Sequence, residues 1–128
     1  MKIYFDGGCK PNPGRIVTAV VAGGRVWHRA DHGSGDNNDA EWIALLEALT
    51  IARDLSLSDV TLLGDSATVF DHANEASRRR TPRFDEYLVK FRALSSGLER
   101  LRIRRIARTQ NLAGIALARL AVPSVISR

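Results

Sequence analysis

The sequence predicts an α/β fold in which helices flank a mixed five-stranded sheet, within a single domain that covers residues 1–128. Short β-branched and aromatic runs separated by glycine and proline occupy the first 28 residues, and helical patterns then alternate with short apolar runs. The chain is 45% hydrophobic, so its 128 residues can bury a substantial core. A hairpin sheet followed by alternating helices and strands is typical of a mixed sheet with flanking helices.

Three sequential antiparallel strands are expected first. Residues 3–5 are Ile, Tyr and Phe, which suit a buried pleated surface, and Asp6 follows them directly. Two prolines and three glycines among residues 7–14 predict that the chain turns just past Asp6. Residues 16–22 form a continuous apolar run, and residues 25–28, behind a Gly-Gly pair, are expected to be the returning strand of a hairpin.

Helices and strands alternate through the rest of the chain. Residues 31–39 form a polar loop, and its Asn37, Asn38 and Asp39 are expected to cap the helix that follows. Beyond the loop we expect helices over residues 40–53, 67–76, 84–98 and 110–120, and strands over residues 60–63 and 101–106. The predicted order is therefore β-β-β-α-β-α-α-β-α.

Three carboxylates stand where these elements would meet. Asp6 and Asp65 each end an expected strand, and Glu41 heads the buried stripe of the following helix, four residues before Leu45. If the two strands are parallel neighbours, the three carboxylates converge. Converging carboxylates repel one another at low dielectric, so such a cluster normally holds divalent cations. For Asp6 alone the alternative is a turn-capping aspartate, because Asp-Gly pairs commonly mark hairpin turns.

An all-carboxylate ligand set also indicates which metals to expect. Hard oxygen ligands select Mg²⁺ or Mn²⁺ over Zn²⁺. Two such ions about 3.5 to 4 Å apart can activate a water and stabilise the leaving oxygen in phosphodiester hydrolysis. We therefore expect two Mg²⁺ or Mn²⁺ ions at this site.

The charge of the chain is distributed unevenly. The net charge is +5, yet residues 1–77 hold six Lys or Arg against eleven Asp or Glu, while residues 78–108 hold eleven against three. Sixteen of the nineteen basic residues are arginine, the side chain best suited to bidentate phosphate contact. A solvated charged face is the simpler explanation, but an Arg-rich half joined to an acidic half favours a polyanionic partner.

The composition also limits where the protein works. No segment approaches the length needed to span a bilayer, and no signal-peptide pattern opens the chain. Cys9 is the only cysteine, so no internal disulfide can form, which agrees with a reducing compartment. We expect a soluble cytoplasmic monomer with no membrane partner and no small-molecule cofactor.

Three motifs resemble those of one family. Residues 4–8, Tyr-Phe-Asp-Gly-Gly, with Asn-Pro-Gly at residues 12–14, closely resemble the opening of type 1 ribonuclease H. Residues 37–42 resemble its Asn-Asn-x-x-Glu helix start, and Gly-Asp-Ser at residues 64–66 resembles its third motif. The match covers essentially the whole chain in the same order. It implies a ribonuclease H-like fold and an endonuclease that cuts the RNA strand of RNA/DNA hybrids with two Mg²⁺ ions, leaving 3′-hydroxyl and 5′-phosphate ends.

The resemblance also implies roles for individual residues. Asp6 would bridge both metals, with Glu41 and Asp65 completing the protein ligands. The positions expected to contact the substrate around the scissile site are Gly7, Gly8, Cys9, Asn12, Asn37 and Asn38. Glycine lets a backbone approach closely, and 2′-hydroxyls in a minor groove distinguish RNA from DNA. The alternatives are structural, with Asn38 only capping a helix and Asn12 only shaping a turn.

The last helix departs from the family pattern. The family usually has a fourth carboxylate there, four residues after an asparagine, but the ungapped alignment puts Ile115 at that position and no acid follows Glu99. Asn111 lies one helical turn before Ile115, and its amide oxygen could serve as a neutral metal ligand. The alternative is that Asn111 caps the last helix. We expect activity with a raised metal requirement.

The expected substrate handling also differs from that of larger relatives. Residues 77–84 are too few for the long basic handle of the larger bacterial enzymes, and Arg78, Arg79, Arg80 and Arg83 are expected to supply its positive charge. Arg108 is the nearest substitute for a histidine that many relatives carry before the last helix. Two other functions stay open: a module of this fold that binds nucleic acid without cutting it, and another nuclease such as a junction resolvase or exonuclease.

Overall fold

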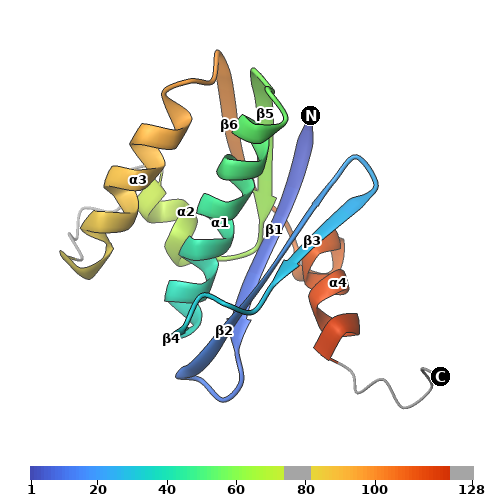
Figure 1. Ribbon diagram of the computed structural model, residues 1–128, viewed down its shortest axis with the longest axis vertical. Helices are drawn as coiled ribbons and strands as arrows, with labels where there is room; N and C mark the ends of the chain where they lie inside the picture. The colour runs from blue at the N-terminus through green and yellow to red at the C-terminus, as the bar shows by residue number, and fades with distance from the viewer. Residues whose placement is uncertain (74–81, 122–128) are drawn as a thin grey trace.

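The computed structural model describes residues 1–73 and 82–121. Its sheet has the strand order β3-β2-β1-β5-β6 (Figure 1). The strands are β1 (Lys2–Cys9), β2 (Gly14–Ala22), β3 (Arg25–Arg29), β5 (Asp59–Gly64) and β6 (Arg100–Arg105). The first three pair antiparallel, and β1–β5 and β5–β6 pair parallel, which confirms the predicted mixed sheet. One strand was not predicted, the two-residue β4 (Ser34–Gly35), which pairs with β2.

The first strand is longer than predicted. The expected turn just past Asp6 is wrong, because β1 continues antiparallel to β2 until Cys9 pairs with Ile16. Backbone pairing along β2 outweighs the poor strand propensity of the two glycines. The parallel pairing with β5 nevertheless ends at Tyr4, opposite Leu63. Asp6 therefore lies beyond the end of β5, inside a strand that projects past its neighbour.

Helices cover both faces of the sheet (Figure 1). The helices are α1 (Asn37–Asp54), α2 (Ala67–Ala73), α3 (Asp85–Ser95) and α4 (Leu112–Ala121), with 3₁₀ turns at Pro82–Phe84 and Arg108–Gln110. On one face α1 packs across β1 and β2 with α3 beside it, and on the other face α4 packs on β1 and β2. The main core lies between α1 and the sheet and centres on the fully buried Trp42, Phe5 and Leu45.

The long helix begins earlier than expected. Its N-cap is Asp36, and Asp36 and Asp39 form a reciprocal capping box in which each side chain accepts from the other's backbone N–H at 2.9 and 3.0 Å. Asn37 and Asn38 therefore lie within the first turn of α1 and do not cap it. The Asp-x-x-Asp spacing is the signal in the sequence that gives the correct start.

Smaller differences occur at the other helix ends. The helix expected over residues 84–98 spans Asp85–Ser95, and the last helix begins at Leu112, so Asn111 immediately precedes it. The expected 67–76 helix is described only as far as Ala73. Within residues 1–73 and 82–121, no helix is both long enough and apolar enough to cross a membrane.

Candidate active site

Three carboxylates meet at the edge of the sheet where β1 projects beyond β5. Asp6, Glu41 and Asp65 each offer an oxygen, and these atoms lie within 4.8 Å of one another. Asp6 comes from β1, Asp65 follows the last residue of β5, and Glu41 comes from the first turns of α1. Because β1 and β5 are parallel neighbours, their carboxyl ends bring the two aspartates to the same edge. The convergence expected from the sequence is therefore present.

Gly7 allows α1 to approach close enough to deliver Glu41. A Cβ at Gly7 would collide with the backbone carbonyl of Ala40, which cannot move without shifting the helix. The Gly7 N–H donates a 2.7 Å hydrogen bond to Glu41 Oε1. Glu41 is only 8% exposed at the head of the buried stripe of α1, as predicted. The missing side chain of Gly7 is therefore required for packing, whatever contact its backbone makes with a substrate.

Burial and like charge shift the proton affinity of two of these carboxylates upward. Burial, and then repulsion from Asp6, raises the pKa of Glu41 to about 9. Burial, and then repulsion from Asp65, raises the pKa of Asp6 to about 6, while Arg108 acts in the opposite direction. Without a cation, this upward pKa shift favours the protonated form of Glu41. The donor set contains no His or Cys, and its repulsion is relieved by positive charge, so it fits a hard divalent cation.

Asn111 joins this site from the N-terminus of α4. Its side chain is fully buried, and its amide nitrogen donates to Asp65 Oδ2 at 2.9 Å and to the Phe5 carbonyl at 3.0 Å. Its Oδ1 accepts from the Ala113 N–H at 3.1 Å, as an N-cap does. All three partners require this orientation of the amide, because a flip would set donor against donor and acceptor against acceptor. The amide N–H therefore faces the carboxylates, and the oxygen faces the helix.

The rest of α4 brings no carboxylate to the site. A Cβ on Gly114 would lie 3.4 Å from Asp6 Oδ2, so this glycine packs directly against the aspartate. Ile115, at the position of the family's fourth acid, is 40% exposed. Gly114 was not among the residues expected at the site, and a glycine inside an otherwise continuous helical pattern is the signal that could have identified it.

The predicted substrate-contact residues form one connected surface beside the carboxylates. Asn37 Oδ1 accepts from the Cys9 N–H, and Asn12 Oδ1 accepts from the Asn37 N–H, both at 3.1 Å. A Cβ at Gly8 would fit without a clash, with Asn37 Oδ1 4.0 Å away. Asn37 is exposed and Asn38 is half-buried in the first turn of α1. The thiol of Cys9 is buried and donates to the Gly35 carbonyl at 3.3 Å, so only the backbone of Cys9 can face a ligand.

The arginines expected to contact nucleic acid are only partly described. Arg78, Arg79 and Arg80 lie outside the described residues. Arg83 donates a 2.7 Å hydrogen bond to Asp36 Oδ2, so one of the four expected phosphate contacts is engaged with the cap of α1. Arg108 is exposed, and its charge lowers the pKa of Asp6.

A brace between α1 and α3 was not found from the sequence. The Tyr87 hydroxyl donates to Asp39 Oδ1 at 3.0 Å, beside the ion pair between Arg83 and Asp36. Burial, and then the bond to Asp39, raises the pKa of Tyr87 to about 12, so this donor keeps its proton. The brace fixes the turn of α1 that carries Glu41.

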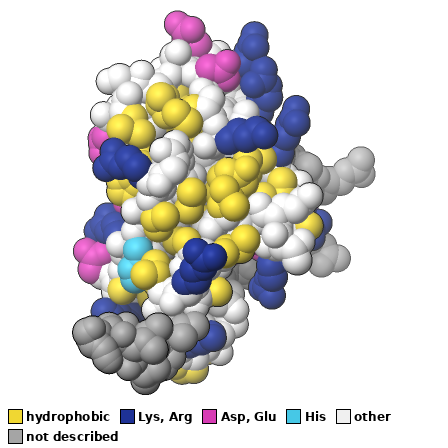
Figure 2. Space-filling view, turned by 90° about the vertical axis from the view of Figure 1, so that its right-hand side faces the viewer, with side chains coloured by type: hydrophobic (Ala, Val, Ile, Leu, Met, Phe, Trp, Pro, Cys, Tyr) yellow, Lys and Arg dark blue, Asp and Glu magenta, His cyan; other side chains and the backbone are white. Residues whose placement is uncertain are grey.

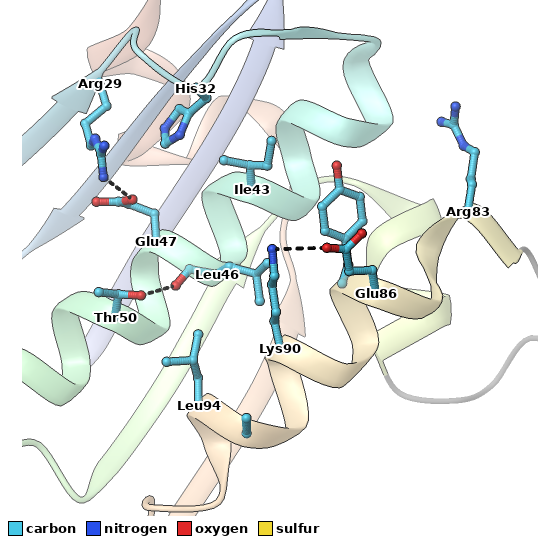
Figure 3. A pocket seen from close by; sticks show the side chains of 12 residues that line it. Arg29, His32, Ile43, Leu46, Glu47, Thr50, Arg83, Glu86, Lys90 and Leu94 are labelled. Atoms are coloured by element: carbon cyan, nitrogen blue, oxygen red, sulfur yellow. Dashed lines mark hydrogen bonds and ion pairs between the residues drawn. The ribbon is translucent and has the colours of Figure 1, made fainter.

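A groove crosses the outer side of α1, between α3 and the segment that follows β3 (Figure 3). Four of its charged side chains form two ion pairs within the groove. Arg29 contacts Glu47 at 3.2 Å, and Lys90 contacts Glu86 at 3.7 Å. The groove therefore offers less free positive charge than the sequence of this region suggests.

The sheet order and the acidic cluster together define a ribonuclease H-like protein with a candidate metal centre. A family profile described as "Reverse transcriptase-like" matches residues 5–121. The ribonuclease HI of Halobacterium salinarum is 34% identical over 120 residues, which cover 90% of this chain and 60% of that protein. This chain therefore spans less than two thirds of the length of that relative.

Solved structures agree with this assignment. The crystal structure of RNase H1 from Halobacterium salinarum NRC-1 has a TM-score of 0.81 at 30% identity, covering 91% of this chain and 92% of that one. The structure of LC11-RNase H1 in complex with an RNA/DNA hybrid has a TM-score of 0.78 and shares the fold at 23% identity, covering 98% and 99% of the two chains. The chain belongs to the ribonuclease H1 family, as its motifs predicted.

Proposed function

We propose that this protein is a metal-dependent endonuclease that hydrolyses the RNA strand of RNA/DNA hybrids and leaves 3′-hydroxyl and 5′-phosphate ends. The observation that carries the proposal is the cluster of Asp6, Glu41 and Asp65 within 4.8 Å. Membership of the ribonuclease H1 family supports the reaction class. The LC11 relative crystallised with an RNA/DNA hybrid supports the substrate.

Asp6, Glu41 and Asp65 would hold two Mg²⁺ or Mn²⁺ ions, with Asp6 shared between them. The ions would supply a water nucleophile at neutral pH and stabilise charge on the leaving oxygen. The chain contributes the placement of the ligands. The Gly7 N–H anchors Glu41 at 2.7 Å, and the Asn111 amide anchors Asp65 at 2.9 Å.

Asn111 fits the role of a positioning residue better than that of a metal ligand. For Oδ1 to face the metals, the amide would have to turn and give up its hydrogen bonds to Phe5, Asp65 and Ala113. Leaving buried backbone groups unsatisfied costs roughly 1 to 3 kcal/mol each. We therefore infer that Asn111 orients the side chain of Asp65. The alternative to test is that its amide oxygen binds a metal ion.

Substrate contacts would extend outward from the metals. The backbone at Gly7, Gly8 and Cys9 and the side chains of Asn12, Asn37 and Asn38 would meet the RNA strand near the cut. Arg108, and with it Arg78, Arg79 and Arg80, would contact phosphates. The absence of a side chain at Gly8 supports close approach of a sugar-phosphate backbone at this point.

Cleavage of a hybrid with an end-labelled RNA strand tests the proposal. The native protein should cut the RNA strand in Mg²⁺ or Mn²⁺, and the Asp6→Asn variant should reduce cleavage to background while the fold is retained. Duplex RNA and branched DNA serve as substrates in the same assay. Cutting branched DNA in preference to the hybrid would indicate a resolvase-type nuclease.

A nucleic-acid-binding module without activity is the second candidate. The observation that favours it is that neither α4 nor Asn111, which precedes it, brings a carboxylate to the site, where Asn111 bonds to Asp65 and Gly114 lies against Asp6. Hybrid binding by the native protein with no cleavage at any Mg²⁺ or Mn²⁺ concentration would establish it.

A further inference from the structure

We propose that β6 carries a second contact surface for the phosphate backbone of nucleic acid, formed by Arg100, Arg102 and Arg104. We call these residues the β6 arginine row. The inference rests on the proposed function for the identity of the nucleic acid, the RNA/DNA hybrid. It extends the contact surface from the carboxylates along the length of the edge strand.

Strand register places the three arginines on one face of the sheet. The alternate residues of β6, Leu101 and Ile103, pack against the main core under α1. Arg100, Arg102 and Arg104 therefore point to the opposite face. The pairing agrees, since Arg104 lies opposite Leu63 and Leu63 lies opposite Tyr4, which packs against the α4 cluster.

Among the residues that the structure describes, no helix is seen packed on this part of the face. All three arginines are exposed, and α4 packs on β1 and β2, away from the edge that β6 forms. Lys2, also exposed, lies in the same cross-strand row as Arg102, because both pair with Thr61. Figure 2 looks onto the side that carries α4 and shows Lys and Arg side chains along the upper right of a hydrophobic area.

The spacing of the row suits a phosphate backbone. Side chains two residues apart on a strand are separated by about 6.6 to 6.8 Å. One nucleic-acid strand presents a phosphate about every 3.4 Å along its helix axis, so each step of the row spans about two phosphates. The guanidinium group also binds phosphate through two parallel hydrogen bonds.

Protection of a sheet edge is the simpler explanation for charge on β6, because charged side chains discourage strands from pairing across an edge. Edge protection does not require a single sign of charge, yet β6 has four arginines and no acid. The one carboxylate on the neighbouring strand that reaches the row is Asp59, 3.5 Å from Arg102 in an exposed pair. A row of like charges that repel one another is better explained by a polyanionic partner.

The row is continuous with the proposed active site. β6 runs parallel to β5, so Arg104 is at the end nearest the carboxylates and Arg100 is at the far end. Beyond the row, the Arg105 Nε donates to the Asp65 carbonyl at 3.4 Å, and the charge of Arg108 acts on Asp6. The groove over α1 offers no comparable row of arginines, because Glu47 pairs with Arg29, Glu86 pairs with Lys90 and Asp36 pairs with Arg83.

The test compares two variants with the same loss of charge. The row variant carries Arg100→Thr, Arg102→Thr and Arg104→Thr, since threonine keeps strand propensity. The control variant carries Arg25→Gln, Arg53→Gln and Lys90→Gln, exposed positions away from the row. Fluorescence anisotropy with a labelled RNA/DNA hybrid in a chelating buffer gives Kd over a range of NaCl concentrations, and circular dichroism confirms that both variants fold.

We expect the row variant to lower the slope of log Kd against log salt concentration by about 2 to 3, at about 0.9 per lost phosphate contact, and the control variant to leave the slope unchanged. The hybrid is then shortened from one end or from the other. Shortening from one end only should abolish the difference in salt slope between the native protein and the row variant. Equal effects of both variants, or no effect of the row variant, would overturn the proposal. If the native protein cuts no hybrid but only the row variant loses slope, the row stands and the proposed activity fails.

Discussion

On each side of the candidate active site a glycine lets a helix approach the carboxylates, but the two helices deliver different chemical groups. On the α1 side, Gly7 gives up its side chain so that the helix can deliver Glu41, a carboxylate whose burial raises its pKa to about 9. On the α4 side, Gly114 lies against Asp6, but the helix delivers the neutral amide of Asn111. The α1 side adds a carboxyl group whose ionised form is disfavoured until a cation is present, and the α4 side adds only hydrogen bonds. The difference predicts that metal affinity depends on the α1 side and the orientation of the ligands on the α4 side.

The largest expected effect comes from closing the gap on the α1 side. Gly7→Ala should lower the free energy of unfolding by about 3 kcal/mol, because the new methyl group collides with the Ala40 backbone. Cleavage should fall as well, since Glu41 is displaced. Gly8→Ala is the matched control, because its Cβ meets nothing closer than 4.0 Å. Denaturant unfolding measures the stability of both variants. Equal stability of the two would contradict this account of Gly7.

On the α4 side, Asn111→Ala should cost about 2 kcal/mol of stability, because it removes the cap of α4 and two donated hydrogen bonds. Asn111→Asp separates the two roles of this residue. As a positioning residue, Asn111 cannot be replaced by a carboxylate that repels Asp65, so metal affinity should fall. Tighter Mg²⁺ or Mn²⁺ binding by Asn111→Asp, seen in thermal shift and cleavage titrations, would instead support direct ligation.

In the absence of metal, the Glu41→Gln variant should become more stable than the native protein as pH rises. Glu41 has a folded pKa of about 9 against an ordinary value of 4.5, so the folded state holds a proton that the unfolded state loses. The contribution of Glu41 to the stability of the metal-free protein therefore falls as pH rises from about 4.5 to about 9, and the variant escapes this loss, so its melting temperature should rise relative to that of the native protein across this range.

Melting temperatures at pH 5, 7 and 9 in a chelating buffer measure this gain. Glu99→Gln, at an exposed position between α3 and β6, serves as the control. A variant that follows the pH dependence of the native protein would show that Glu41 is not held protonated. With metal added the order should reverse, because the native carboxylate then gains a ligand bond and the amide does not.

The smallest effect is expected from restoring an acid to α4. Ile115→Asp should lower the Mg²⁺ concentration that gives half-maximal cleavage severalfold, because the affinity of hard-cation sites rises with ligand charge. Leu112→Asp adds the same charge at a similarly exposed position of α4, 45% against 40%. If both variants shift the titration equally, the effect is general electrostatics and α4 has no metal-binding position.

Much of this molecule could be predicted from local patterns. The runs around Phe5 and Val60, and the helical stripe through Leu45, gave the sheet and its main helix, because apolar periodicity reports which face is buried. The three carboxylates were found because a strand end and a buried helix face are unusual places for charge. The start of α1 was predicted three residues too late, although the spacing of Asp36 and Asp39 indicates a capping box at the correct position.

The sequence by itself determined the order of the main strands and helices, the family and the three acids that converge. The tertiary structure alone decided that β1 continues past Asp6, that Gly7 is needed for helix packing, and that Asn111 turns its nitrogen toward Asp65. The physical reason is how far apart in the sequence the interacting groups lie. Periodicity, capping and turn preferences act over a few residues, whereas strand register, backbone approach and the satisfaction of a buried amide depend on groups such as Phe5 and Asn111 that are 106 residues apart.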